Sequence, residues 1–162
     1  MKLQTKNSNW GLGLLVVVML VVFLGLFFQQ QRPQNNNATI PIAESSLSIN
    51  NHTILLDIAD TPALQRQGLS DRESLADNTG MLFVFPEKSI QNFWMYNMHF
   101  PLDVVWISDQ TVVGLQKNIP LPTTEDIPRF SSPIPVNYVL ELNAGFIKKH
   151  GISVGDMVTF NL

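Results

Sequence analysis

Two acidic residues that interrupt apolar, β-prone runs are the first candidates for chemistry. Asp103 begins the run Asp-Val-Val-Trp-Ile-Ser, and Glu141 lies inside Val-Asn-Tyr-Val-Leu-Glu-Leu, so both carboxyls are expected to be largely buried. A carboxylate that leaves water needs a charged or hydrogen-bonding partner, and Arg72 is the candidate cation. The set is interpreted either as a structural ion pair or as a ligand-binding or catalytic carboxylate pair.

If Asp103 and Glu141 act together, cleavage of a glycosidic bond is the reaction that fits them. Two carboxyls held about 5–10 Å apart supply an acid together with a base or nucleophile. These two residues are therefore the candidate catalytic residues. The discriminating observation is geometric: carboxyls that open into one concave pocket indicate an enzyme, whereas a pair sealed against Arg72 indicates a structural or binding role.

The densest aromatic stretch, residues 93–103, combines thioethers with an imidazole. Met95, Met98 and His99 offer the soft ligands that Cu(I) prefers. The favoured interpretation is structural, with Met95 and Trp94 in the core and Met98 and His99 as turn residues. No two of the three histidines have metalloprotease spacing, and the sequence contains no Gly-x-Ser-x-Gly elbow. We therefore predict neither a metal site nor a cofactor.

The charge balance and the cysteine content exclude further classes of protein. From Ser46 onward the chain carries seven Lys and Arg residues against twelve Asp and Glu residues, a formal charge of −5. An acidic surface without a basic stripe repels phosphate backbones, so nucleic acid is not an expected partner. The absence of cysteine excludes disulfides, thiolate nucleophiles and cysteine-ligated zinc.

An apolar run at residues 11–28 is expected to hold the chain in a membrane. As a helix its 18 residues would extend about 27 Å, close to the hydrocarbon thickness of about 30 Å. The run is longer than that of a secretory signal peptide, and Gln and Asn residues follow it in place of a small-residue cleavage site. We therefore predict an uncleaved anchor, followed by a flexible polar tether at residues 29–45.

The charges that flank the apolar run predict its orientation. Lys2 and Lys6 precede the run, whereas Arg32 alone follows it closely. Because positive charge favours the cytoplasmic side, residues 1–10 are expected to stay in the cytoplasm. The predicted location is the cytoplasmic (inner) membrane of a prokaryote, crossed once, with residues 46–162 outside as a periplasmic or extracellular domain.

Residues 46–162 contain short β-prone runs separated by turn residues. Asn50-Asn51 lies between the first two runs and predicts a hairpin, because asparagine tolerates positive φ. Thr61-Pro62 predicts the start of a short helix that ends at Gly68, and a second short helix is expected at residues 146–150. The runs between the helices are expected to pair as an antiparallel meander. We therefore predict one mainly β domain, an antiparallel sandwich or barrel with two short helices.

The segment 118–135 carries five of the ten prolines. Its length exceeds the usual limit of about 12–15 residues for a loop inside a compact domain. Long ordered loops often act as lids or binding surfaces, whereas proline-stiffened segments also cover sheet edges. Both interpretations stay open.

Several motifs occur in a recognisable order: Gly68-Leu69-x-x-Arg72, Gly80-Met81-Leu82-Phe83-x-Phe85, Phe93-Trp94-Met95-x-Asn97, Pro101-Leu102-Asp103, Tyr138-Val139-Leu140-Glu141-Leu142, Gly145 and Gly155-Asp156. With them the chain resembles the domain of unknown function 192 family of bacteria and archaea, over residues 47–160. The resemblance implies a compact jelly-roll β-sandwich, often behind a signal or anchor, and no established activity. Arg72, Asn97, Asp103 and Glu141 match the family pattern and are the candidates for a ligand-binding site or a buried polar network.

The leading functional hypothesis is a non-enzymatic binding or interaction module of the cell envelope. The sequence supplies a scaffold, a tether and a long loop, but no evident nucleophile or metal cage. The expected partners are the membrane, through the N-terminal run, and an envelope protein or polymer as ligand. The alternative is an envelope-polymer hydrolase that uses Asp103 and Glu141.

Overall fold

The computed structural model describes residues 44–162. The expected cytoplasmic segment (1–10), the apolar run (11–28) and residues 29–43 of the tether lie outside this range. Within residues 44–162, no helix is long and apolar enough to cross a membrane. The elements follow in the order β1 (Ser46–Ile49), β2 (His52–Ala59), α2 (Pro62–Gln67), β3 (Thr79–Ser89), β4 (Asn92–Trp94), β5 (Leu102–Ser108), β6 (Thr111–Ile119), β7 (Arg129–Ser131), β8 (Val136–Asn143), α3 (Phe146–Lys149) and β9 (Val158–Asn161).

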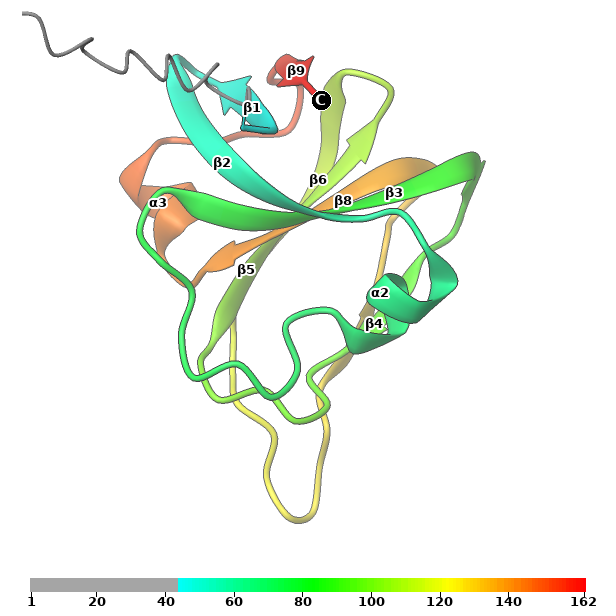
Figure 1. Cartoon of the computed structure of the whole chain (residues 1–162), viewed down its shortest axis with the longest axis vertical. Helices are drawn as coiled ribbons and strands as arrows, with labels where there is room; N and C mark the ends of the chain where they lie inside the picture. Colours follow the sequence, from blue (N-terminus) through cyan, green and yellow to red (C-terminus); the bar gives the residue numbers. More distant parts are fainter. Residues whose placement is uncertain (1–43) are drawn as a thin grey trace, which may run out of the picture. The chain divides into compact units, whose positions relative to one another are not determined.

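Seven strands form one curled sheet in the order β6-β5-β8-β3-β2-β1-β9, and β4 and β7 form a separate two-stranded ribbon (Figure 1). The two ends of the curled sheet meet through backbone hydrogen bonds. Val112 N donates to Asp156 O at 2.9 Å, and Val158 N donates to Gln110 O at 2.8 Å. The fold is therefore mainly β, a curled half-barrel with two short helices, which confirms the sequence prediction at this level.

The central strands of the sheet are buried on both faces, so the domain has two apolar cores. The core inside the curl is built around Leu47, Ile49, Ile54, Leu82, Val105, Ile107, Leu140, Leu142, Phe146 and Ile147. The core on the opposite face, which includes residues next to the β4–β7 ribbon, is built around Leu69, Met81, Phe83, Met95, Met98, Val104, Trp106 and Val139. Because side chains alternate along a strand, neighbouring residues of β5 and β8 enter different cores.

Local signals in the sequence account for the turns and the first helix. Asn50 and Asn51 have φ values of 51° and 63° and turn β1 into the antiparallel β2, as expected of the hairpin. The Thr61 side chain accepts a hydrogen bond from Leu64 N at 3.3 Å, and Gly68, at φ 51°, ends α2. The predicted hairpin and the predicted helix ends are thus confirmed. Both could be predicted because each depends on residues close in sequence.

The predicted antiparallel meander is wrong in three respects. β8 inserts between β3 and β5 and runs antiparallel to both. β2 and β3 pair in parallel, joined by the connection that contains α2. β4 leaves the main sheet and pairs with β7, which lies inside the segment expected to be a loop (118–135). β8 takes the central place because its residues are apolar toward both cores, and such a strand is most stable where both faces are covered.

Candidate functional site

Asp103 is fully buried and is held by two backbone donors. Its Oδ1 accepts a hydrogen bond from Asn118 N at 2.7 Å, and its Oδ2 accepts one from Ile147 N at 2.9 Å. Hydrogen bonds from backbone N–H groups stabilise the charged carboxylate. The side chain therefore ties β5 to the end of β6 and to the start of α3, which is a structural task inside the curl.

Glu141 lies on the other face of the sheet. Val104 pairs directly with Glu141, and Asp103 pairs with Leu142, in the antiparallel β5–β8 ladder. Directly paired residues point to the same face and successive residues alternate, so the two carboxyls point in opposite directions. The structure does not bring Asp103 and Glu141 into one site, so the carboxylate pair that was one of the two interpretations is not formed.

Glu141 is a nearly buried residue whose carboxyl reaches a cavity and is not fully sealed from solvent; among residues 44–162 the sealed side-chain polar atom that lacks a partner is His150 Nε2. Glu141 is 4% exposed, and no ion pair or side-chain hydrogen bond involves its carboxyl among residues 44–162. Burial alone raises the pKa of Glu141 from 4.5 to about 8. At neutral pH the side chain therefore carries its proton and can both donate and accept a hydrogen bond.

Arg72 and Asn97, the other candidates for a polar network, lie elsewhere. Arg72 forms an ion pair with Asp57, and both side chains are well exposed. Asn97 occupies a turn at φ 51°, where its carbonyl oxygen accepts a hydrogen bond from Asp71 N at 2.9 Å. An asparagine at position 97, which matches the family pattern, is therefore explained by the turn, because asparagine tolerates a positive φ. The four predicted residues do not form one network.

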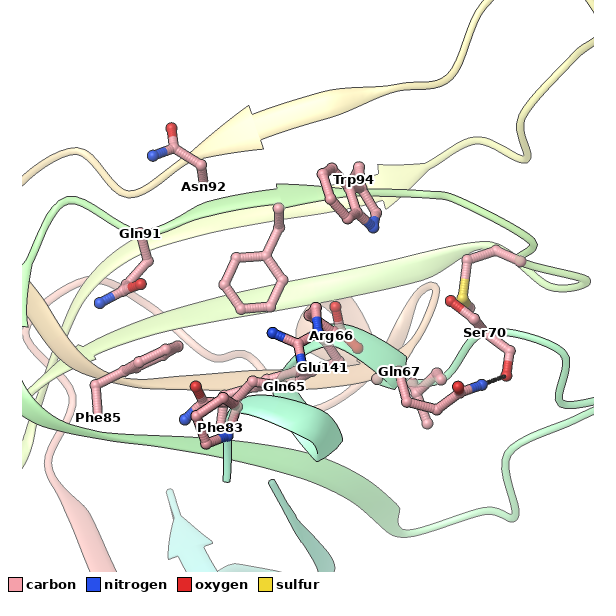
Figure 2. A pocket seen from close by; sticks show the side chains of 15 residues that line it. Gln65, Arg66, Gln67, Ser70, Phe83, Phe85, Gln91, Asn92, Trp94 and Glu141 are labelled. Atoms are coloured by element: carbon pink, nitrogen blue, oxygen red, sulfur yellow. Dashed lines mark hydrogen bonds between the residues drawn. The ribbon is translucent and has the colours of Figure 1, made fainter. Parts of the chain in front are cut away.

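Glu141 contributes to a cavity of about 300 Å³ that opens to solvent between the curled sheet and α2. Figure 2 shows Asn92 and Trp94 on one side of it and Gln65, Phe83 and Glu141 on the other. The complete lining comes from α2 and the turn after it, from β3, from β4 with residues on either side of it, and from one residue of β8: Pro62, Gln65, Arg66, Gln67, Gly68, Leu69, Ser70, Phe83, Phe85, Gln91, Asn92, Phe93, Trp94, Met98 and Glu141. Glu141 is the only acidic residue of this lining.

Hydrogen bonds hold the α2 wall of the cavity in place. Gln65 Nε2 donates to Val84 O at 2.8 Å and so fixes α2 against β3. Ser70 Oγ donates to Tyr96 O at 2.8 Å and joins the turn after α2 to the segment after β4. Because both bonds connect segments distant in sequence, the cavity is present before any ligand arrives.

Aromatic packing holds the opposite wall. Phe93 of β4 packs edge-on against Phe83 and Trp106, with ring centroids 4.8 Å and 5.7 Å away. Phe93 also stacks on Phe130 of β7, at 6.1 Å. Such contacts add stabilisation beyond area burial. Trp94 follows Phe93 on the ribbon; it was expected in the core, but it is 50% exposed and contributes to the cavity lining.

The methionines and histidine considered for copper lie in different environments. Met95 and Met98 are buried in the core beside the ribbon. His99 is exposed and its Nδ1 lies 3.4 Å from the Glu73 carboxylate. No cluster of three or more His, Cys, Asp or Glu residues suited to a metal occurs within residues 44–162.

Sequence reasoning missed most of the cavity. Gln65, Gln67, Gln91 and Asn92 were not singled out, because isolated amide side chains carry no motif. A signal was present in the polar residues that flank Phe93-Trp94, since exposed aromatics beside amides are typical of binding surfaces. Glu141 was identified correctly as an acid in an apolar strand, but the face it points to was not known.

Comparison with known proteins identifies relatives without an assigned activity. A family model described as DUF192, Uncharacterized ACR, matches residues 45–160. No curated protein matches the chain.

Two solved structures share the fold. A protein from Sinorhizobium meliloti 1021, for which a role as a transcription regulator has been suggested, is 33% identical with a TM-score of 0.67, over 73% of this chain and 94% of that one. A protein of unknown function from Novosphingobium aromaticivorans DSM 12444 is 28% identical with a TM-score of 0.66, over 74% of this chain and 89% of that one.

Proposed function

The chain belongs to the uncharacterised domain of unknown function 192 family, and on that premise we propose that its β domain is a ligand-binding module of the cell envelope. The binding site is the cavity between α2, β3, β4 and β8. The proposal extends to the N-terminal part of the chain: residues 11–28 anchor the module in the cytoplasmic membrane, and residues 29–45 tether it on the outer side.

The observation that carries the proposal is the unpartnered Glu141 carboxyl in an open cavity. Glu141 is only 4% exposed, lines the cavity and is not used in an ion pair within residues 44–162, so its carboxyl is available to a molecule that enters the cavity. The cavity around Glu141 is mostly aromatic and amide in character. A concave, partly apolar site with a few converging polar groups is the usual form of a ligand pocket. A bound ligand would supply the hydrogen bonds that Glu141 lacks.

The geometry favours binding over hydrolysis. A glycoside hydrolase of the usual type needs two carboxyls on either side of the scissile bond. Glu141 is the only acid that lines the cavity, and both carboxylate oxygens of Asp103 are occupied by backbone donors on the far face of the sheet. The alternative of an envelope-polymer hydrolase that uses both residues therefore lacks its second group.

The role suggested for the Sinorhizobium meliloti protein does not extend readily to this chain. The domain from Ser46 onward carries a formal charge of −5. Proteins that bind DNA gain most of their affinity from lysine and arginine contacts to phosphates. We therefore retain a ligand of the envelope, a protein or a polymer, as the proposed partner.

Site-specific photo-crosslinking in intact cells tests the binding role. A benzoylphenylalanine at position 67 replaces the exposed Gln67 at the cavity, and the same residue at position 148 replaces the exposed Lys148 of α3 as the matched control. We expect a discrete adduct from position 67 that position 148 does not give. Identical adducts from both positions, or none from position 67, would contradict the proposed site.

A reporter that is active only outside the cytoplasm tests the proposed topology separately. Fused to the C-terminus of the full chain, it should be active, and the same fusion should become inactive when residues 11–28 are deleted. Activity only from a cytoplasmic reporter would overturn the membrane part of the proposal and leave the cavity unaffected.

A further inference from the structure

We infer that the ligand of this cavity is a carbohydrate, bound through one sugar ring stacked at Trp94 with its hydroxyls directed toward Glu141 and the glutamine amides. The inference rests on the proposed function, because it names the ligand class of the same site. Three features of the cavity support it: its aromatic surface, the hydrogen-bonding groups left unused by the protein, and the balance of charge.

The aromatic surface is placed for stacking. Trp94 contributes to the cavity lining and is half exposed, and the guanidinium of Arg129 covers one face of its ring, 5.7 Å from the centroid. Arg129 is also the residue paired with Trp94 across the β4–β7 ribbon, so it holds the indole by one face and the sugar ring would stack on the other. A rigid indole with electron-rich faces matches the weakly positive C–H face of a pyranose ring.

The hydrogen-bonding groups at the cavity suit hydroxyls. Gln65, Gln67 and Gln91 all use their amide nitrogens within the protein, as donors to Val84 O at 2.8 Å, Ser70 O at 3.1 Å and Ser89 Oγ at 2.7 Å. Figure 2 marks the bond from Gln67 to Ser70. None of the three amide oxygens accepts a hydrogen bond from residues 44–162. These bonds orient the amides and leave acceptors for a ligand that donates.

Donors are present at the same cavity. Asn92 accepts a hydrogen bond from Ser131 Oγ through Oδ1 at 2.7 Å, which leaves its amide nitrogen as a donor. The Trp94 indole N–H and the Glu141 carboxyl are further donors without a hydrogen-bond partner in the described part of the chain. A hydroxyl group both donates and accepts, so a polyhydroxylated ring can satisfy this mixed set, whereas a purely donating or accepting ligand cannot.

The charges of the cavity disfavour ionic ligands. Arg66 lies on the α2 wall and repels a bound ammonium group, and a protonated Glu141 offers it no negative charge. A phosphorylated ligand would meet one arginine inside a domain of formal charge −5. A neutral saccharide encounters neither penalty.

Direct binding measurements on the full chain test the inference. The chain is placed in phospholipid nanodiscs, because alkyl-glycoside detergents carry sugar headgroups that would compete. Maltotriose, cellotriose, chitotriose and mannotriose are the saccharide probes, and butylamine, phenylalanine and adenosine are the non-sugar probes. Saturation-transfer NMR identifies binding, and calorimetry measures the affinity. We expect at least one trisaccharide to bind.

Four variants locate the site. Trp94→Ala should weaken saccharide binding about five- to tenfold, the value of one aromatic contact. Tyr96→Ala, the matched control, should leave it unchanged, because Tyr96 has a similar exposure of 52% but does not line the cavity. Glu141→Gln retains a donor and an acceptor and should keep binding, whereas Glu141→Leu removes both and should weaken binding about tenfold.

The outcomes separate the ligand class from the proposed function. Saccharide binding that is equal in Trp94→Ala, Tyr96→Ala and Glu141→Leu would overturn the carbohydrate inference at this cavity. Binding of a non-sugar probe, with no saccharide bound and with loss in Glu141→Leu, would also overturn it but would leave a ligand site in place. Failure of every probe to bind, together with no adduct from position 67, would overturn both.

Discussion

The most informative perturbation is Glu141→Gln, a change that removes a titratable proton and little else. The two side chains have nearly the same volume, so the packing beside the cavity should be preserved. We expect the variant to be more stable than the wild type at neutral and alkaline pH and about equally stable near pH 4.5. The free energy of unfolding of the wild type should therefore decrease as the pH rises, and Glu141→Gln should abolish this dependence.

The magnitude follows from the raised pKa. Burial moves the pKa of Glu141 from 4.5 to about 8, so between these values the folded chain holds a proton that the unfolded chain has released. The folded state then binds more protons, and stability falls as pH rises through this window. At about 1.4 kcal/mol per pH unit, the loss reaches about 3 kcal/mol near pH 7 and about 5 kcal/mol above pH 8.

The assay is urea unfolding of the full chain in nanodiscs, followed by tryptophan fluorescence at several pH values. Glu125→Gln is the matched control, since Glu125 is exposed and the same substitution there should leave the pH profile unchanged. Asp103→Asn should act in the opposite direction and cost about 2–3 kcal/mol, because it disturbs charge-assisted bonds to Asn118 N and Ile147 N.

Two results would refute this reasoning. If Glu141→Gln destabilised the protein at every pH, the carboxyl would have a stabilising partner that the geometry does not contain. If the wild type and the variant had parallel pH profiles from about pH 4.5 to 8, the side chain would be solvated and its pKa ordinary. Either result would also remove the observation on which the proposed binding site rests.

Three further predictions concern other parts of the domain. Arg72→Ala should change unfolding free energy by less than about 1 kcal/mol and leave ligand binding intact, because its ion pair with Asp57 is exposed. Gly114→Ala should destabilise the fold by about 1–3 kcal/mol in the same assay, since a Cβ there would lie 2.7 Å from Pro133 Cγ. His150 has a pKa lowered from 6.5, chiefly by burial, so the folded chain binds fewer protons than the unfolded chain in acid. Stability should therefore decrease below about pH 6.5, and less steeply in His150→Gln, as followed by urea midpoints.

The features predicted correctly from sequence are those set by neighbouring residues. The cap at Thr61 and the positive-φ glycine at Gly68 define α2 without help from the rest of the chain. The asparagine turn between β1 and β2 is equally local. Burial of Asp103 and Glu141 was also predictable, because each interrupts an apolar run that only a core strand would carry.

The features that could not be predicted depend on distant pairing. The place of β8 between β3 and β5 brings together strands separated by a ribbon, a hairpin and a long connection. Because β4 pairs with β7, part of the proline-rich segment 118–135 forms one strand of the ribbon. Neither pairing leaves a local signal, since the energy comes from contacts that form after the chain has folded back on itself.

By itself, the sequence determined that this chain has an apolar N-terminal run, a mainly β domain with two short helices, and two acids expected to leave water. Only the tertiary structure decided what each acid does. The β5–β8 register turns Asp103 toward two backbone donors and Glu141 toward an open cavity, and a shift of one residue along either strand would have placed both carboxyls on the same face. Alternation along a strand is a property of the sequence, but the face that a residue occupies is a property of the folded sheet.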